Sequence, residues 1–185
     1  MGPLLIVILA AVVLGAVMLI GLYNSLVRKR IMTQEAWSQI DVQLKRRYDL
    51  IPNLVETVKG YAAHEKNTLE AVIAARNAAS SATGVAEKAQ AENMLTGALR
   101  QIFALSEAYP NLKANENFQH LQEELSHTEN NIAFARQHYN DSTAIYNSAV
   151  QTFPSNMVAG MFGFTIREYF ELEAPAEREA PKVKF

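Results

Sequence analysis

The sequence predicts an all-α protein, in which one N-terminal transmembrane helix precedes an elongated antiparallel bundle of three long helices. Three observations support this fold class. Residues 1–27 carry no charged side chain, although the 185-residue chain contains 17 basic and 19 acidic residues. Residues 28–152 contain only two prolines and few glycines, which disfavours a β-sheet protein. Apolar residues in that region recur at heptad spacing, which is typical of packed helices.

Composition excludes several classes of protein. The chain has no cysteine, so it holds no disulfide and no cysteine-built zinc or iron–sulfur site. Its formal net charge of −2 provides no basic field for nucleic acid, and we expect no nucleic-acid partner.

Residues 3–27 form the predicted transmembrane helix, with residues 1–2 outside the membrane. A helix of about 20–25 residues, rising about 1.5 Å per residue, matches a hydrocarbon core of about 30 Å. A cleaved signal peptide is the main alternative. Such a peptide normally has a basic start and a cleavage site with small residues, and residues 1–27 have no basic side chain.

Basic residues after the apolar segment predict its orientation. Arg28, Lys29 and Arg30 follow it directly, and residues 45–47 add three more cations against Glu35 and Asp41. The positive-inside rule places the N-terminus outside and residues 28–185 in the cytoplasm. The first three cations either lie near anionic headgroups or serve only as the flank that stops translocation.

Residues 28–153 form the predicted bundle. Its first helix covers residues 31–79, where one heptad row comprises Trp37, Leu44, Ile51 and Val58, with polar interruptions at Arg47 and Glu65 in the seam. Pro52 lies within this helix, and because the register is kept on both sides we expect a kink rather than a break. Residues 79–84 end the helix.

The second and third helices are bounded by proline and asparagine signals. The second covers residues 85–109 and ends at Tyr109 and Pro110, because a residue before proline is disfavoured in helical conformation. Asn115 is the expected N-cap of the third helix, which continues to residue 153 and is closed by Pro154.

Residues 154–173 form an apolar, glycine-containing segment. Its part 155–166 is too short to span a membrane and poor in helix-forming residues. It could cap the end of the bundle, contact lipid or form a subunit contact. Residues 174–185 are rich in proline and charge and are predicted to be disordered.

No catalytic constellation is evident. Glu124 and His127 form one Glu-x-x-His element, but di-iron bundles need two, and His120 and His127 fall on the outer heptad position. We therefore expect that the protein is not an enzyme and binds neither a metal nor a cofactor. A metal-binding bundle enzyme is a remote alternative. The pair Tyr139-Asn140 recurs one heptad later as Tyr146-Asn147. These residues either form polar layers in the core, where the tyrosine hydroxyls are hydrogen-bonded, or form a binding site.

Several blocks in order resemble the LemA family, over roughly residues 20–172. The blocks contain Trp37, Asp41, Arg46, Arg47, Asp49, Pro52, Asn53, Tyr109, Pro110, Tyr139, Asn140, Tyr146, Asn147, Phe153 and Pro154, to which we assign structural or interaction roles. The resemblance implies a bacterial membrane protein with one N-terminal transmembrane helix, its N-terminus outside and a helical cytoplasmic bundle. The family has no established enzymatic activity. Its relatives in magnetosome membranes and its genomic association with membrane proteases point to membrane organisation.

The leading hypothesis is a non-enzymatic scaffold in the bacterial cytoplasmic membrane, which self-associates and organises membrane or partner proteins. The alternative is an adaptor or regulator in a membrane protease or envelope-stress pathway. Expected partners are the lipid bilayer, further copies of the chain and other membrane proteins such as a protease.

Overall fold

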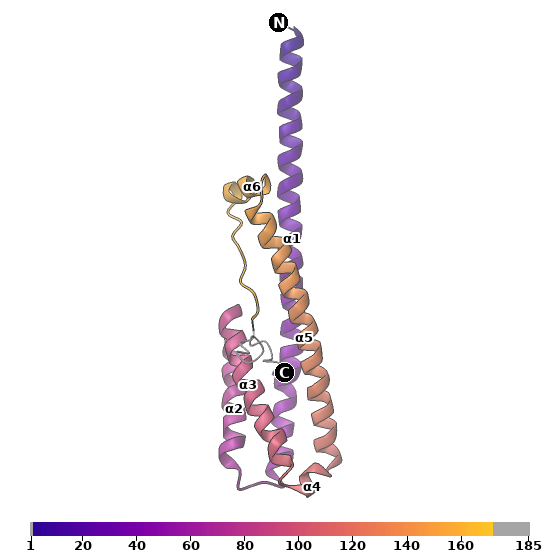
Figure 1. The fold of residues 1–185 in the computed structure, drawn as a ribbon, viewed down its shortest axis with the longest axis vertical. Helices are drawn as coiled ribbons and strands as arrows, with labels where there is room; N and C mark the ends of the chain where they lie inside the picture. The colour runs from indigo at the N-terminus through magenta and orange to yellow at the C-terminus, as the bar shows by residue number, and fades with distance from the viewer. Residues whose placement is uncertain (1, 172–185) are drawn as a thin grey trace, which may run out of the picture. The chain divides into compact units, whose positions relative to one another are not determined.

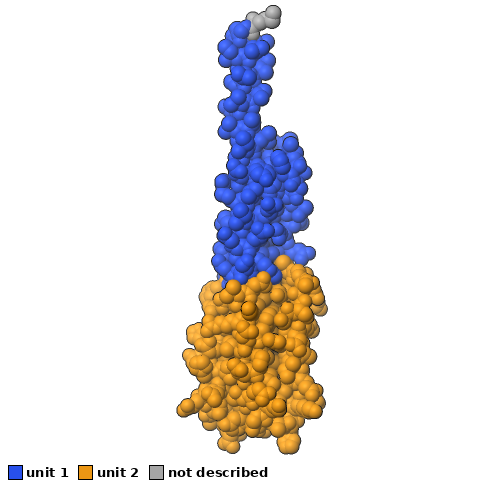
Figure 2. All heavy atoms as spheres, turned by 180° about the vertical axis from the view of Figure 1, so that it is seen from behind, with its two compact units in different colours: residues 1–39, 135–168 blue, residues 40–134, 169–185 orange. Residues whose placement is uncertain are grey.

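The computed structural model describes residues 2–171 and confirms the all-α class, with no strand among those residues (Figure 1). The helices are α1 (Gly2–Lys59), α2 (Lys66–Ser81), α3 (Val85–Ser106), α4 (Pro110–Lys113), α5 (Glu116–Gln151) and α6 (Ser155–Phe162). The expected disorder of residues 174–185 lies outside the described residues. The chain divides into two compact units, coloured separately in Figure 2.

Unit 1 comprises residues 1–39 and 135–168, and its described part contains the first part of α1, the end of α5, α6 and an extended segment. The two long helices run antiparallel, because Leu26 and Thr33 of α1 meet Tyr146 and Ser142 of α5 respectively. A small core forms where α6 closes over them, with Leu26, Tyr146, Val158, Ala159 and Phe164 buried.

The first part of α1 has no cover within unit 1. Every side chain from Gly2 to Gly21 is exposed, and the segment is long and apolar enough to cross a membrane. In water such a surface would cost free energy in proportion to its apolar area. The predicted segment 3–27 is therefore helical and qualifies by length and composition as a membrane span.

Unit 2 comprises residues 40–134 and 169–185, and in its described part α2 and α3 lie beside the end of α1 and the start of α5 (Figure 1). Successive long helices run antiparallel. The core is made by large apolar side chains that are almost fully buried: Ile40, Leu44, Ile51, Leu54, Leu95, Ile102, Leu112 and Phe118. The cap at Asn115 is confirmed, because its Oδ1 accepts a hydrogen bond of 2.9 Å from the Phe118 amide.

The predicted helix over residues 31–79 is two helices. The α1 helix continues through Pro52, as expected, but ends at Lys59, and the chain turns before α2 begins at Lys66. Val58 and Val72 are two heptads apart in the sequence, and both are buried. The heptad pattern therefore continues across the turn and does not distinguish one continuous helix from this helical hairpin. Gly60, a weak helix former, marks the turn.

The prediction that residues 155–166 form helix poorly is also wrong for α6. Its glycines disfavour a helix, but Val158 and Ala159 bury their side chains against α1 and α5. Tertiary packing of this kind overrides a weak local propensity. Gly163, at φ 69°, ends the helix in the left-handed conformation that glycine tolerates.

Candidate functional site

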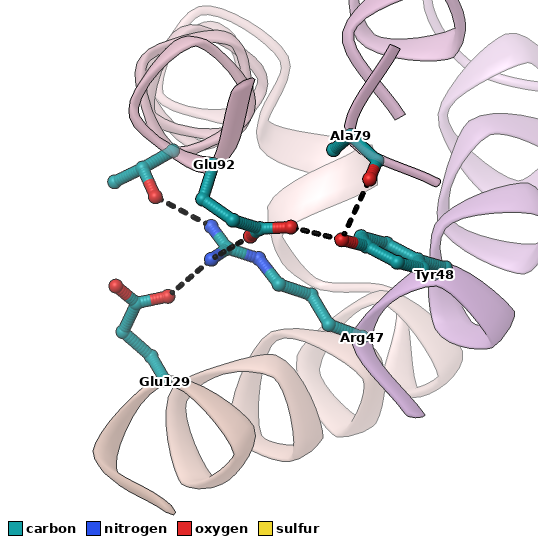
Figure 3. A network of polar contacts seen from close by, with 6 residues as sticks. Arg47, Tyr48, Ala79, Glu92 and Glu129 are labelled. Carbon is teal, nitrogen blue, oxygen red and sulfur yellow. Dashed lines mark hydrogen bonds and ion pairs between the residues drawn. The ribbon is translucent and has the colours of Figure 1, made fainter. Parts of the chain in front are cut away.

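A buried cluster of charged and polar groups lies inside unit 2, centred on Arg47 (Figure 3). Arg47 Nη1 lies 3.2 Å from Glu92 Oε2 and 3.0 Å from Glu129 Oε2, and its Nη2 donates to Thr96 Oγ1 at 2.7 Å. The side chains of Arg47 and Glu92 are 4% and 2% exposed, whereas that of Glu129 is 45% exposed. The cluster thus joins α1 to α3 and α5 through one guanidinium.

Tyr48 extends the cluster to α2. Its hydroxyl donates to Glu92 Oε1 and lies 3.2 Å from the Ala79 carbonyl oxygen (Figure 3). A tyrosine hydroxyl has one proton and cannot donate fully to both acceptors.

The protonation of the cluster follows from its burial. Desolvation raises the pKa of Glu92 above its ordinary value, against the lowering effects of the Tyr48 hydrogen bond and the Arg47 charge. Burial and the contact with Glu92 raise the pKa of Tyr48, which therefore stays neutral. Each charge of the buried pair therefore has a partner inside the core.

A cleft of about 260 Å³ opens beside Arg47, between α3 and α5. Its walls combine charged residues with apolar ones, including Arg100, Phe103, Leu125 and Glu129. A cleft that combines apolar and polar lining residues is typical of a surface that can bind a side chain or a small ligand.

The other predicted motif residues of unit 2 are dispersed. Arg46 Nη2 lies 2.6 Å from Glu124 Oε2 and lowers the pKa of that carboxyl, and Asp41 lies 3.5 Å from Lys88 Nζ. Tyr109 donates to Glu65 Oε1 at 3.1 Å, which accounts for the polar interruption at Glu65. Of the remaining four motif residues, Asp49, Pro52 and Asn53 are exposed on α1, and Pro110 begins α4.

In unit 1 the Tyr-Asn pairs hold the extended segment after α6. The hydroxyls of Tyr146 and Tyr139 donate to the carbonyl oxygens of Thr165 and Glu168, both at 2.9 Å. Asn147 makes two bonds of 2.8 Å with the backbone of Arg167, donating to its carbonyl and accepting from its amide. These side chains therefore bind main-chain atoms of their own chain.

The other motif residues of unit 1 lie around this segment. The Trp37 ring packs edge-on to Tyr139 at 5.2 Å between centroids, and Asn140 is half-buried. Phe153, in contrast, is 78% exposed, and the half-buried Pro154 precedes α6.

The predicted basic residues have different surroundings. Arg28 is exposed, Lys29 Nζ donates to Ser25 Oγ at 2.9 Å, and the Arg30 guanidinium lies 5.0 Å from the centre of the Phe164 ring. All three follow the exposed apolar residues 2–21 of α1 in the chain.

Sequence reasoning missed four residues of this cluster: Tyr48, Glu92, Thr96 and Glu129. Glu92 shares a helix face with Leu95, Leu99 and Ile102, all of them buried. The sequence did contain a signal for a buried ion pair: Glu92 lies on an apolar helix face, and Arg47 lies in the apolar seam of another helix.

The histidines bring no metal site into view. All four are exposed, and within residues 2–171 no group of three or more His, Cys, Asp or Glu side chains could hold an ion.

Comparison with known proteins identifies the family. The sequence pattern of the LemA family matches residues 36–185. The chain is 28% identical to magnetosome protein MamQ 2 of Paramagnetospirillum magneticum, over 95% of this chain and 75% of that protein. It is 28% identical to magnetosome protein MamQ of Magnetospirillum gryphiswaldense, over 83% and 66%, and 30% identical to protein LemA of Metamycoplasma hominis, over 76% and 64%. The chain therefore belongs to the LemA family of helical, membrane-associated proteins.

Proposed function

We propose that this protein is a non-enzymatic scaffold, anchored by residues 2–21 of α1 in the cytoplasmic membrane, which self-associates and organises other proteins there. The observation that carries the proposal is the exposed apolar segment of α1, which in unit 1 leads directly into residues packed by α5 and α6. A structural role is supported by the Arg47 cluster, whose buried charges are bound to each other. Similarity to magnetosome proteins fits a role in organising membranes.

The proposed orientation places the N-terminus outside. The three cations at residues 28–30 favour the cytoplasmic side, whereas Arg47 is buried in ion pairs and adds little to the surface charge. Because the chain has no cysteine, single cysteines can report the topology. A membrane-impermeant maleimide added to intact cells should label Gly2→Cys and leave Ser38→Cys unlabelled, and the reverse pattern would contradict the orientation.

Self-association is supported by an open groove in unit 1. The groove measures about 570 Å³ and is lined mainly by small and apolar side chains of α1 and α5, among them Leu22, Ser25, Ala144, Ile145 and Ser148. Small side chains allow a second helix to approach closely.

The oligomeric state in mild detergent tests this proposal. Light scattering across micromolar concentrations should show a species larger than the monomer, and a strictly monomeric particle would contradict self-association. Ile145→Glu places a charge in the groove and should reduce the size. The matched control is Ile73→Glu, on an exposed position of α2 in unit 2, which should not.

The second candidate function is an adaptor for a membrane protease or a stress regulator. The cleft beside Arg47 favours it, because Phe103 and Arg100 offer apolar and charged contacts to a partner. Crosslinking in native membranes separates the two functions, since a scaffold gives adducts of the chain with itself and an adaptor gives adducts with other proteins. Elemental analysis of protein purified without chelators, compared with the His127→Ala variant, tests the remote metal-enzyme alternative.

A further inference from the structure

The α6 helix exposes an apolar face. Val158 and Ala159 are buried in unit 1, but Met157 and Met161, four residues apart on the other face, are 61% and 70% exposed. Phe153, in the turn before α6, is also exposed. A surface helix of a water-soluble protein normally has polar residues on its outer face, so this face requires an apolar or amphipathic environment.

The position of α6 in unit 1 indicates what that environment is. The Phe162 ring lies 4.9 Å from the Tyr23 ring of α1, and Leu22 packs against the core that contains Val158. Leu22 is also the first half-buried residue of α1. A span of about 20 residues starting at Gly2 measures about 30 Å and ends at the same level. The α6 helix therefore packs on the span at its boundary (Figure 1).

The charge distribution of unit 1 agrees with this position. No charged side chain occurs between Asp141 and Arg167, so the end of α5 and all of α6 are as uncharged as residues 1–27. The first charges beyond Tyr23 on α1 are the cations at residues 28–30. One to two helical turns separate them from Tyr23, which suits contact with anionic headgroups next to an apolar layer.

We propose that α6 is a second membrane contact, a short interfacial helix whose exposed Met157 and Met161, together with Phe153 in the turn before it, insert into the bilayer that α1 crosses. The proposal rests on the proposed membrane span. Helices of this kind lie in the plane of the interface with their apolar face about 5–10 Å into the boundary between headgroups and acyl chains. The same contact would hold the end of α5 at the membrane surface and limit rotation of unit 1 about the axis of α1.

Site-directed spin labelling of the full chain tests the proposal, because the native sequence has no cysteine to remove. The chain is reconstituted into vesicles of phosphatidylethanolamine and phosphatidylglycerol, and a nitroxide is attached to Met161→Cys or Met157→Cys. Both positions are exposed, so the label leaves the core intact. Val13→Cys in the span and Ser38→Cys on the exposed surface of α1 are the lipid and water controls. Collisions with oxygen, which concentrates in lipid, and with a water-soluble nickel chelate give the depth of each label.

The expected result is a deep Val13 label, an aqueous Ser38 label, and labels at residues 157 and 161 that lie about 5–10 Å inside the interface. Labels at 157 and 161 that contact the chelate as freely as Ser38, with Val13 still in lipid, would overturn the α6 proposal and leave the anchor intact. Labels at residues 157 and 161 that are shielded from both oxygen and the nickel chelate would also overturn the proposal. That result would indicate that a second copy of the chain covers this face of α6. An aqueous Val13 label would instead refute the membrane span itself.

Discussion

Replacing Arg47 with methionine tests whether the buried cluster is a matched set of charges. Arg47→Met keeps most of the apolar stem but leaves the Glu92 carboxylate, 2% exposed, without its cation. Removing one partner of a buried ion pair costs about 3–5 kcal/mol, because the remaining charge is neither hydrated nor paired. Glu129 adds little to this cost, since its half-exposed side chain can turn to water.

The assay is urea unfolding of the full chain in detergent, followed by far-UV circular dichroism. With a dependence on urea of about 2 kcal/mol per M, a loss of about 3–5 kcal/mol lowers the midpoint by roughly 1.5–2.5 M. The matched control is Arg46→Met on the same helix. Its partner Glu124 is paired at the surface, so the expected loss is below about 1 kcal/mol.

The double variant Arg47→Met/Glu92→Met completes the cycle. Replacing a buried ion pair by apolar residues of similar volume is often neutral or stabilising, so the double variant should be within about 1 kcal/mol of the wild type or above it. A single variant Arg47→Met that loses no more than Arg46→Met would refute the reasoning. So would a double variant that is as unstable as the single one.

Three further predictions concern protonation and the segment after α6. Burial raises the pKa of Glu92, so its contribution to stability is complete below its ordinary value of 4.5 and is lost as pH rises through the raised folded value. The urea midpoint of wild type relative to Glu92→Gln should therefore fall as pH rises, and a constant difference would contradict the shift. Asn147→Ala removes both bonds to the Arg167 backbone and should cost about 1–3 kcal/mol, with faster hydrogen exchange at the Arg167 amide; unchanged exchange there would show that Asn147 does not hold the segment. Gly163→Ala meets no atom within 4 Å, so its expected cost of about 1 kcal/mol, measured as a lower Tm, comes only from the backbone at φ 69°; an equal Tm would argue against this conformation.

The fold class could be predicted because local signals agreed with it. The uncharged N-terminal segment, the Asn115 cap and the proline after Tyr109 all specify their structure within a few residues of sequence. The turn between α1 and α2 could not be found in the same way. A heptad repeat gives the face of a helix that is buried, and it does not reveal whether the helix has reversed direction when two buried positions are a whole number of heptads apart.

The sites depended on contacts between distant parts of the sequence. Arg47 was recognisable as a polar residue in an apolar seam, but its partners Glu92 and Glu129 lie on two other helices. Helix formation at residues 155–162 likewise required the packing of Val158 and Ala159 on α1 and α5. Local propensity contains neither kind of information.

The hydrogen bonds of Asn147 to the Arg167 backbone leave the sequence of that segment free to vary. The bonds are made to a backbone amide and a backbone carbonyl, and every residue except proline has both groups. The side chains of residues 165–168 are exposed to solvent. The side chains of residues 165–168 can therefore change without loss of these bonds, whereas Arg167→Pro would remove the amide proton that the segment donates to Asn147 Oδ1.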